Sequence, residues 1–228
     1  MEIIAVGGIG EVTHGDDVAA LIADALGFPL TSGDIVVVTH KIVSKAEGAL
    51  RSYSTEEERR HIVEGEAASV IRRRGDLTIT LTKHGFICAN AGVDRSNTAP
   101  GTLVLLPDDP DRSAQRIRAK LEHRFSVSLG VVITDTFGRP WRTGLTDVAI
   151  GVAGLPSIVD YRGTTDTHGN TLDVTEVAVA DEIAAAADLV MGKASGIPVA
   201  IVRGLTFNSA ESGRAAELVR DPGDDLFR

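Results

Sequence analysis

A chain of 228 residues with 43% hydrophobic side chains is long enough to bury a substantial core, in one large domain or in two small lobes. Its formal charge of −9 argues against a general nucleic-acid binder, because phosphate backbones select basic surfaces. No apolar run approaches the roughly 18 residues of a membrane span, and the N-terminus lacks the pattern of a secretory signal. The lone Cys88 fits a reducing compartment, so we expect a cytoplasmic protein without nucleic-acid or membrane partners.

Apolar runs separated by turn residues predict strands and helices along the whole chain. Some predicted strands follow one another directly and others are joined through helices, which is typical of a mixed α+β sheet rather than a doubly wound parallel one. Strands are predicted at 2–6, 35–38, 77–81, 86–90, 103–106, 130–133 and 197–202. Helices are predicted at 18–26, 55–74, 108–124 and 174–189, with a short helix and a polar tail in the final segment, 208–228.

Two segments that follow predicted strands carry residues suited to anions. The turn at 7–11 holds three glycines, but it lacks the full G-x-G-x-x-G pattern and does not by itself indicate phosphate binding. Lys41 and Lys45 lie four residues apart just after the strand at 35–38. On a helix this spacing places two ammonium groups on one side, either facing one anion or forming a solvated face.

The stretch from 130 to 170 has the highest density of candidate functional residues. We expect its apolar strand, 130–133, to end at Asp135 and Thr136 and to present the carboxylate on a loop at the edge of a cleft. The alternative is a loop of solvated charges. The charged and aromatic residues that follow are Trp141, Arg142, Asp147, Asp160, Arg162, Asp166 and His168.

The acids expected on loops are Asp94, Asp135 and Asp166, with Asn97, Thr136 and His168 beside them. Hard oxygen donors of this kind suit magnesium or manganese better than zinc, which prefers thiolate and imidazole. The chain contains no G-x-x-x-x-G-K-[ST] motif and no G-x-S-x-G motif, which argues against a P-loop and an acyl-enzyme hydrolase. Residue types alone therefore indicate an enzyme that uses a metal ion and phosphate.

Five segments, in this order, resemble the coenzyme F420:L-glutamate ligase family. They are VTHKIVSKAEG (38–48), ICANAGVDRSN (87–97), VVITDTFGRPWRTGLTDVAIGVAGL (131–155), YRGTTDTHGN (161–170) and VRGL (202–205). The resemblance implies a two-lobed α+β monomer with a mixed sheet, an intertwined homodimer, and a ligase domain over 1–207 with possibly interleaved lobes. It also implies GTP bound between the lobes, with Mg²⁺ or Mn²⁺ and a potassium requirement.

Carried over by position, the resemblance implies a set of site residues. The metal ligands are Asp94, Asp135 and Thr136, and the catalytic residues are Lys45 and Asp135. The nucleotide contacts are Ile9, Gly10, Glu11, Val12, His40, Lys41, Lys45, Asn97, Met191, Gly192, Lys193, Ser195 and Gly196, the last five within a loop at 191–198. Two positions depart from the family pattern: some archaeal members have glutamine in place of Lys193, and proline often stands in place of Gly10.

The reaction implied is the GTP-dependent addition of γ-linked L-glutamate to coenzyme F420-0 through an acyl phosphate, with release of GDP. Arg139, Arg142 and Arg162 are candidates for binding the substrate's anionic groups, or else form structural ion pairs. In actinobacteria a similar unit is joined to a flavin-dependent reductase domain, which this chain lacks. The alternatives are a metal-dependent nucleotide phosphohydrolase and a non-catalytic regulatory module that binds GTP or metal.

Overall fold

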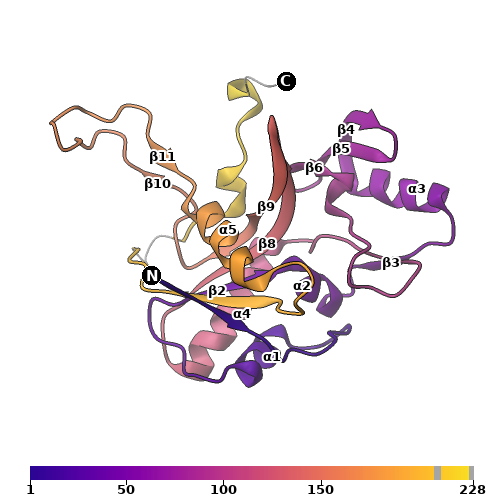
Figure 1. Cartoon of the computed structure of the whole chain (residues 1–228), viewed down its shortest axis with the longest axis horizontal. Helices are drawn as coiled ribbons and strands as arrows, with labels where there is room; N and C mark the ends of the chain where they lie inside the picture. The colour runs from indigo at the N-terminus through magenta and orange to yellow at the C-terminus, as the bar shows by residue number, and fades with distance from the viewer. Residues whose placement is uncertain (208–211, 226–228) are drawn as a thin grey trace.

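The computed structural model describes residues 1–207 and 212–225, and its centre is a five-stranded mixed sheet (Figure 1). The strand order is β1 (Glu2–Val6), β12 (Val199–Arg203), β2 (Ile35–Thr39), β8 (Gly130–Arg139) and β9 (Arg142–Ala153). The β2–β8 pair is parallel and the other neighbouring pairs are antiparallel. The predicted mixed α+β sheet is therefore confirmed.

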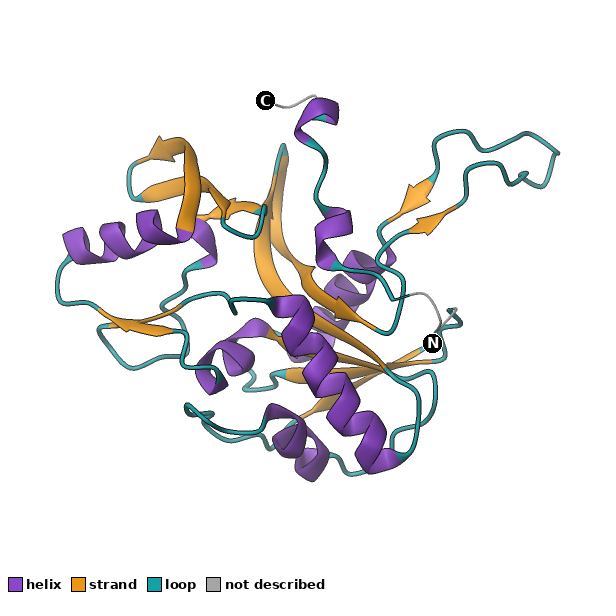
Figure 2. Cartoon of the chain, turned by 180° about the vertical axis from the view of Figure 1, so that it is seen from behind, coloured by secondary structure: helices purple, strands orange, loops and turns teal. Residues whose placement is uncertain are grey.

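Helices cover both faces of this sheet. α4 (Pro110–Phe125) and α1 (Val18–Ala25) pack together on one face, and α5 (Val179–Met191) lies on the other (Figures 1 and 2). Because both faces are covered, the central strands are continuous apolar runs: the side chains at 35–38 and 131–133 are completely buried. The helices begin at predicted polar caps, since Asp17 accepts hydrogen bonds from the first turn of α1 and Asp109 does so for α4.

The chain leaves the central sheet after α2 (His40–Ala46) and returns at α4. The intervening residues form α3 (Glu56–Glu66), a three-stranded sheet of β4 (Ala67–Arg74), β5 (Leu77–Thr82) and β6 (Ile87–Ala89), and a short pair, β3 (Leu50–Ser52) with β7 (Thr102–Val104). These elements lie to one side of the sheet, at the right of Figure 1. They form the second wall of the cavity described below.

The helix predicted at 55–74 is wrong in its second half. A capping box between Thr55 and Glu58 begins α3 as expected, but the helix ends at Glu66 and β4 follows. β4 contains the β-branched pair Val70 and Ile71, and it forms a hairpin with β5 across a two-residue turn that starts at Gly75, which has a φ of +58°. The hairpin partner outweighs the helix propensity of the arginines beside it.

The strand predicted to end before Asp135 continues instead to Arg139. Residues 134–139 pair with β9, so Asp135 and Thr136 belong to a hairpin ladder and not to a free loop. The turn falls at Pro140 and Trp141, where Trp141 has a φ of +54°. A rigid hairpin rather than a loop therefore positions these side chains.

Residues that follow this hairpin form an arm that leaves the body of the molecule. Its root pairs β10 (Val159–Asp160) with β11 (Glu176–Val177), and its outer part extends to the upper left of Figure 1. Because β11 takes the residues before 178, α5 starts at Val179 rather than at the predicted 174.

The predicted C-terminal helix begins partly outside the described residues. Within the described part of this segment, the chain forms two 3-10 helices, Ala215–Leu218 and Pro222–Asp224. No helix among the described residues is long and apolar enough to cross a membrane.

Candidate functional site

The parallel pairing of β2 and β8 explains where the candidate site lies. Thr39, the last residue of β2, pairs with Thr134 of β8, so the residues that follow on both strands emerge at the same edge of the sheet. His40 and Lys41 are thereby brought beside Asp135. A cavity of about 680 Å³ opens at this edge, a volume typical of small-molecule sites.

Lys41 and Lys45 project from α2 toward this cavity. The Lys41 ammonium lies 2.9 Å from the Asp94 carboxylate. Lys45 is only 6% exposed, and its ammonium lies 2.6 Å from the Glu11 carboxylate and donates to the Asn97 carbonyl at 2.7 Å. The alternative of a solvated helix face is therefore wrong: the two lysines connect α2 to the loops at both ends of the cavity.

Asp94 is held as a carboxylate by its neighbours. Both its oxygens accept hydrogen bonds from Ser96, from the backbone N–H at 2.8 Å and from the hydroxyl at 2.7 Å. Burial opposes ionisation of Asp94, but the Lys41 charge and the Ser96 hydrogen bonds outweigh it and lower its pKa to about 2. The cavity therefore holds a fixed negative charge beside a fixed positive one.

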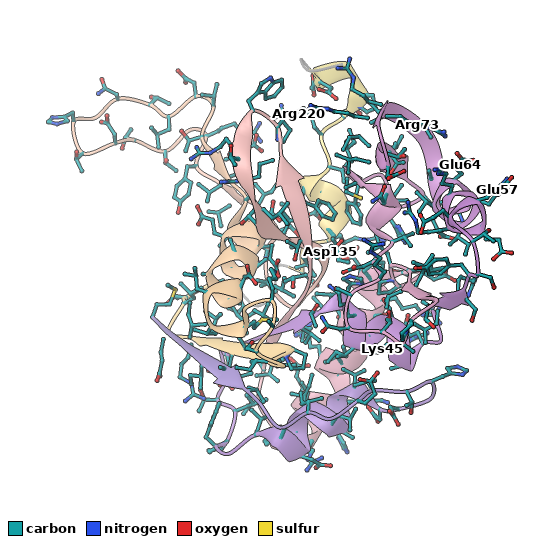
Figure 3. The ribbon with its side chains drawn as sticks, turned by 45° about the vertical axis from the view of Figure 1, so that its right-hand side comes forward. Lys45, Glu57, Glu64, Arg73, Asp135 and Arg220 are labelled. Carbon is teal, nitrogen blue, oxygen red and sulfur yellow. The ribbon has the colours of Figure 1, made fainter. Side chains whose placement is uncertain are left out.

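Asp135 faces His40, which is completely buried. The His40 Nε2 atom lies 3.2 Å from Asp135 Oδ1, yet the alignment does not form a hydrogen bond, so Nε2 has no hydrogen-bond partner among the described residues. The other ring nitrogen lies 3.3 Å from the Ser44 hydroxyl. Figure 3 shows Asp135 near the middle of the molecule, with Lys45 below it on α2. A buried imidazole nitrogen without a partner is rare, and it marks the surroundings of Asp135 as a candidate binding position.

A second group of charges surrounds Lys193 on the α5 side of the hairpin. Its ammonium lies 2.6 Å from an oxygen of Asp147, 2.6 Å from an oxygen of Asp188 and 2.8 Å from the Thr136 hydroxyl. The Thr136 hydroxyl also donates to Asp147 at 2.6 Å. Burial works against the charge of Lys193, but the two carboxylates outweigh it and raise its pKa.

Nearly all residues of the predicted site line this one cavity. Those that do are Ile9, Gly10, Glu11, Val12, Lys41, Lys45, Asp94, Asn97, Asp135, Thr136, Met191, Gly192, Lys193 and Gly196. The exceptions are His40, which lies behind Asp135, and Ser195, whose hydroxyl donates to the Met191 carbonyl. Their roles in binding stay predictions, but their convergence from five separate segments is a finding.

Sequence reasoning missed Asp188 and did not assign Asp147 to the site. Asp147 pairs with Thr136 across the hairpin, so recognising the hairpin would have revealed it. Asp188 lies on α5 with no local signal. Cys88 also lines the cavity as a buried thiol, as expected, and burial, with a contribution from the Asp135 charge, raises its pKa to about 12.

The structure separates the charged residues at 160–168 from Asp135. Arg162 lies on the arm, where its guanidinium is 2.7 Å from Asp160 and 3.1 Å from Glu176. Asp166 and His168 lie near the outer end of the same arm, and Asp166 Oδ1 accepts the His168 backbone N–H at 2.8 Å. The prediction that the whole stretch forms one site is therefore wrong, because the arm carries its second half away.

Arg139, one of the arginines considered for substrate binding, has a local structural role. It lies near the tip of the β8–β9 hairpin, and its guanidinium donates to the Thr143 carbonyl at 2.7 Å. This contact connects the two strands of the hairpin on either side of the turn.

The donor chemistry of the cavity fits a hard divalent cation. Asp94, Asp135 and Thr136 contribute oxygen donors from two different elements, and the unsatisfied His40 nitrogen lies beside Asp135. No group of three or more His, Cys, Asp or Glu side chains among the described residues is already arranged to hold a metal. Such an ion would therefore depend on oxygens from a second molecule, as metals bound together with phosphates do.

Comparison with known proteins adds a family to this geometry. Residues 8–204 match the family described as F420-0:gamma-glutamyl ligase. The chain is 43% identical to the coenzyme F420:L-glutamate ligase of Methanopyrus kandleri, covering 96% of this chain and 94% of that protein. It is 43% identical to that of Methanothermobacter thermautotrophicus, over 100% and 99%, and 37% identical to that of Methanocaldococcus jannaschii, over 88% and 87%.

Proposed function

The chain belongs to the F420-0:gamma-glutamyl ligase family, and from that premise we propose that it is a GTP-dependent ligase that adds γ-linked L-glutamate to coenzyme F420-0. The relatives that carry this name align with the chain over almost its whole length. The proposal is supported by a cavity large enough for small molecules and lined by ammonium and carboxylate groups.

The chemistry of the reaction explains why a nucleotide is needed. A carboxylate is a poor acyl donor, because its oxygen is a bad leaving group at neutral pH. Transfer of the γ-phosphoryl group of GTP to the terminal carboxylate of F420-0 forms an acyl phosphate and releases GDP. The amine of glutamate then attacks the acyl carbon, an amide bond forms, and inorganic phosphate leaves with the carboxylate oxygen to which it was attached.

Lys45 is the residue that we assign to charge stabilisation during phosphoryl transfer. Its ammonium is buried and held in position by Glu11 and by the Asn97 carbonyl, so it needs little reorganisation as negative charge shifts between oxygens. In this proposal the loops at 9–12 and 191–198 bind the nucleotide from either side of the cavity.

A divalent cation, Mg²⁺ or Mn²⁺, held by Asp94, Asp135 and Thr136, would neutralise the phosphate charges when bound. Asp94 suits this role because its low pKa keeps it a carboxylate throughout the physiological range. We also propose a requirement for potassium and a homodimeric assembly, both on the basis of the family resemblance.

The observation that carries the proposal is the convergence of Lys45, Asp94 and Asp135 on one cavity. The test incubates the full chain with F420-0, GTP, Mn²⁺, potassium and L-glutamate, followed by mass spectrometry of the coenzyme. We expect products heavier by one or more glutamyl residues, together with GDP that forms only when glutamate is present. GDP formation without glutamate or coenzyme would indicate a phosphohydrolase, and nucleotide binding without any GDP would indicate a regulatory module.

A further inference from the structure

The ammonium of Lys193 is enclosed by oxygens from three separate elements. Thr136 comes from β8, Asp147 from β9 and Asp188 from α5, and all three oxygens lie within 2.8 Å of Nζ. These contact distances show that the three groups together accommodate a cation. We name this set of oxygens, from Thr136, Asp147 and Asp188, the oxygen cage.

The cage differs from an ordinary surface ion pair. Lys120, for comparison, contacts a single carboxylate, that of Asp17, and both side chains are about half exposed. The Asp147 side chain is only 5% exposed and accepts hydrogen bonds from Thr134 at 3.1 Å and Thr136 at 2.6 Å. A buried carboxylate without a compensating cation is costly, so the position occupied by Lys193 Nζ requires positive charge.

The donors of the cage are also the kind that divalent metals prefer. Two carboxylates and a hydroxyl are hard oxygen ligands, which suit Mg²⁺ and Mn²⁺. Nothing in the chemistry of the cage itself selects an ammonium over a metal ion; the Lys193 side chain supplies the cation from within the chain.

We propose that Lys193 is a built-in cation that occupies a metal position beside the cavity, and that removing its ammonium opens this position to a divalent metal. The lysine thereby keeps the loop at 191–198 fastened to the β8–β9 hairpin and to α5 without a metal at this point. That this loop borders a nucleotide rests on the proposed function, but the cation exchange does not, because it involves only the chain and a metal ion.

The test counts Mn²⁺ ions bound per chain, by equilibrium dialysis or by electron paramagnetic resonance of free Mn²⁺, in the absence of nucleotide. Lys193→Met removes the charge while retaining a long unbranched side chain. We expect it to bind one more Mn²⁺ per chain than the native protein does. Adding Asp147→Asn to that variant is expected to abolish the extra ion, since the carboxylate at the centre of the cage is then lost.

Two further variants make the outcome decisive. Lys120→Met removes a lysine paired to one surface aspartate and is expected to leave the Mn²⁺ count unchanged. If Lys193→Met does not fold, as judged by thermal unfolding without metal, Lys193→Gln carries the same test, because its amide can still hydrogen-bond to Asp147. A folded Lys193 variant with an unchanged Mn²⁺ count, and with a melting temperature that Mn²⁺ raises no more than in the native chain, would overturn the proposal.

Discussion

At the residue scale, Asp135 is the side chain on which the proposed chemistry depends most directly. It lies in a rigid ladder with its carboxylate beside a buried imidazole, so its position does not depend on loop motion. Asp135→Ala is expected to reduce GDP release in the presence of F420-0 and glutamate about 100- to 1,000-fold, equivalent to about 3–4 kcal/mol in the barrier. Asp24→Ala, at a surface acid paired with Arg124, is the control and should turn over normally. Turnover of Asp135→Ala close to that of the control would remove Asp135 from the mechanism.

Asp94 leads to a prediction about pH at the same scale. Its folded pKa of about 2 lies below the ordinary value of 3.8, so its ionisation stabilises the fold above pH 3.8, and this contribution is lost as the pH falls through about 2. Its side chain is 33% exposed, and solvent screening limits the effect to on the order of 1 kcal/mol. Urea unfolding of native protein and Asp94→Asn should therefore differ more at pH 7 than at pH 3. A difference that is constant between these two pH values contradicts this account.

At the element scale, the contact of α4 with β9 depends on a residue without a side chain. A Cβ atom on Gly151 would lie 2.5 Å from the Pro110 carbonyl oxygen, at the start of α4. Gly151→Ala must therefore push the helix away from the sheet, at an expected cost of about 1–3 kcal/mol in the free energy of unfolding. Urea denaturation of the purified variant measures this cost.

Gly138 in the same hairpin provides the matched control. A Cβ atom there would have nothing within 4 Å, and the residue is absent from the positive-φ positions of the described backbone. Gly138→Ala is expected to change the free energy of unfolding by less than about 0.5 kcal/mol. Equal losses in the two variants would mean that the clash with Pro110 does not limit stability.

At the scale of the whole molecule, the arm is the feature that a compact monomer does not explain. It extends from the body in Figure 1, and Val174 near its root is 86% exposed. If the proposed homodimer forms through this arm, light scattering should give about twice the 24.0 kDa mass of the chain. Val174→Asp is expected to weaken the dimer at least tenfold, whereas Leu189→Asp, at an 85% exposed position on α5, should leave it intact. A native chain that stays at 24.0 kDa at micromolar concentration would contradict the dimer.

The sequence by itself determined the elements whose signal is local. Continuous apolar runs predicted β2 and the first part of β8, and capping residues predicted the starts of α1, α3 and α4. The alternation of helix-linked and adjacent strands also predicted the mixed sheet. The family resemblance pointed to Lys45, Asp94 and Asp135, and these three residues do line one cavity. The predictions of strands and helix starts succeeded because burial and capping depend on residues that are neighbours in the chain.

Only the tertiary structure decided the features that depend on long-range pairing. β4 is a strand because β5 completes its ladder, and Asp135 lies on a strand because β9 supplies the hydrogen bonds that a loop would lack. The same pairing places Asp147 beside Thr136, while the packing of α5 brings Asp188 to Lys193. The composition of residues 130–170 indicated one site, but the arm carries its second half away. Local patterns specify which side chains avoid water, whereas backbone pairing between distant segments specifies which charges meet.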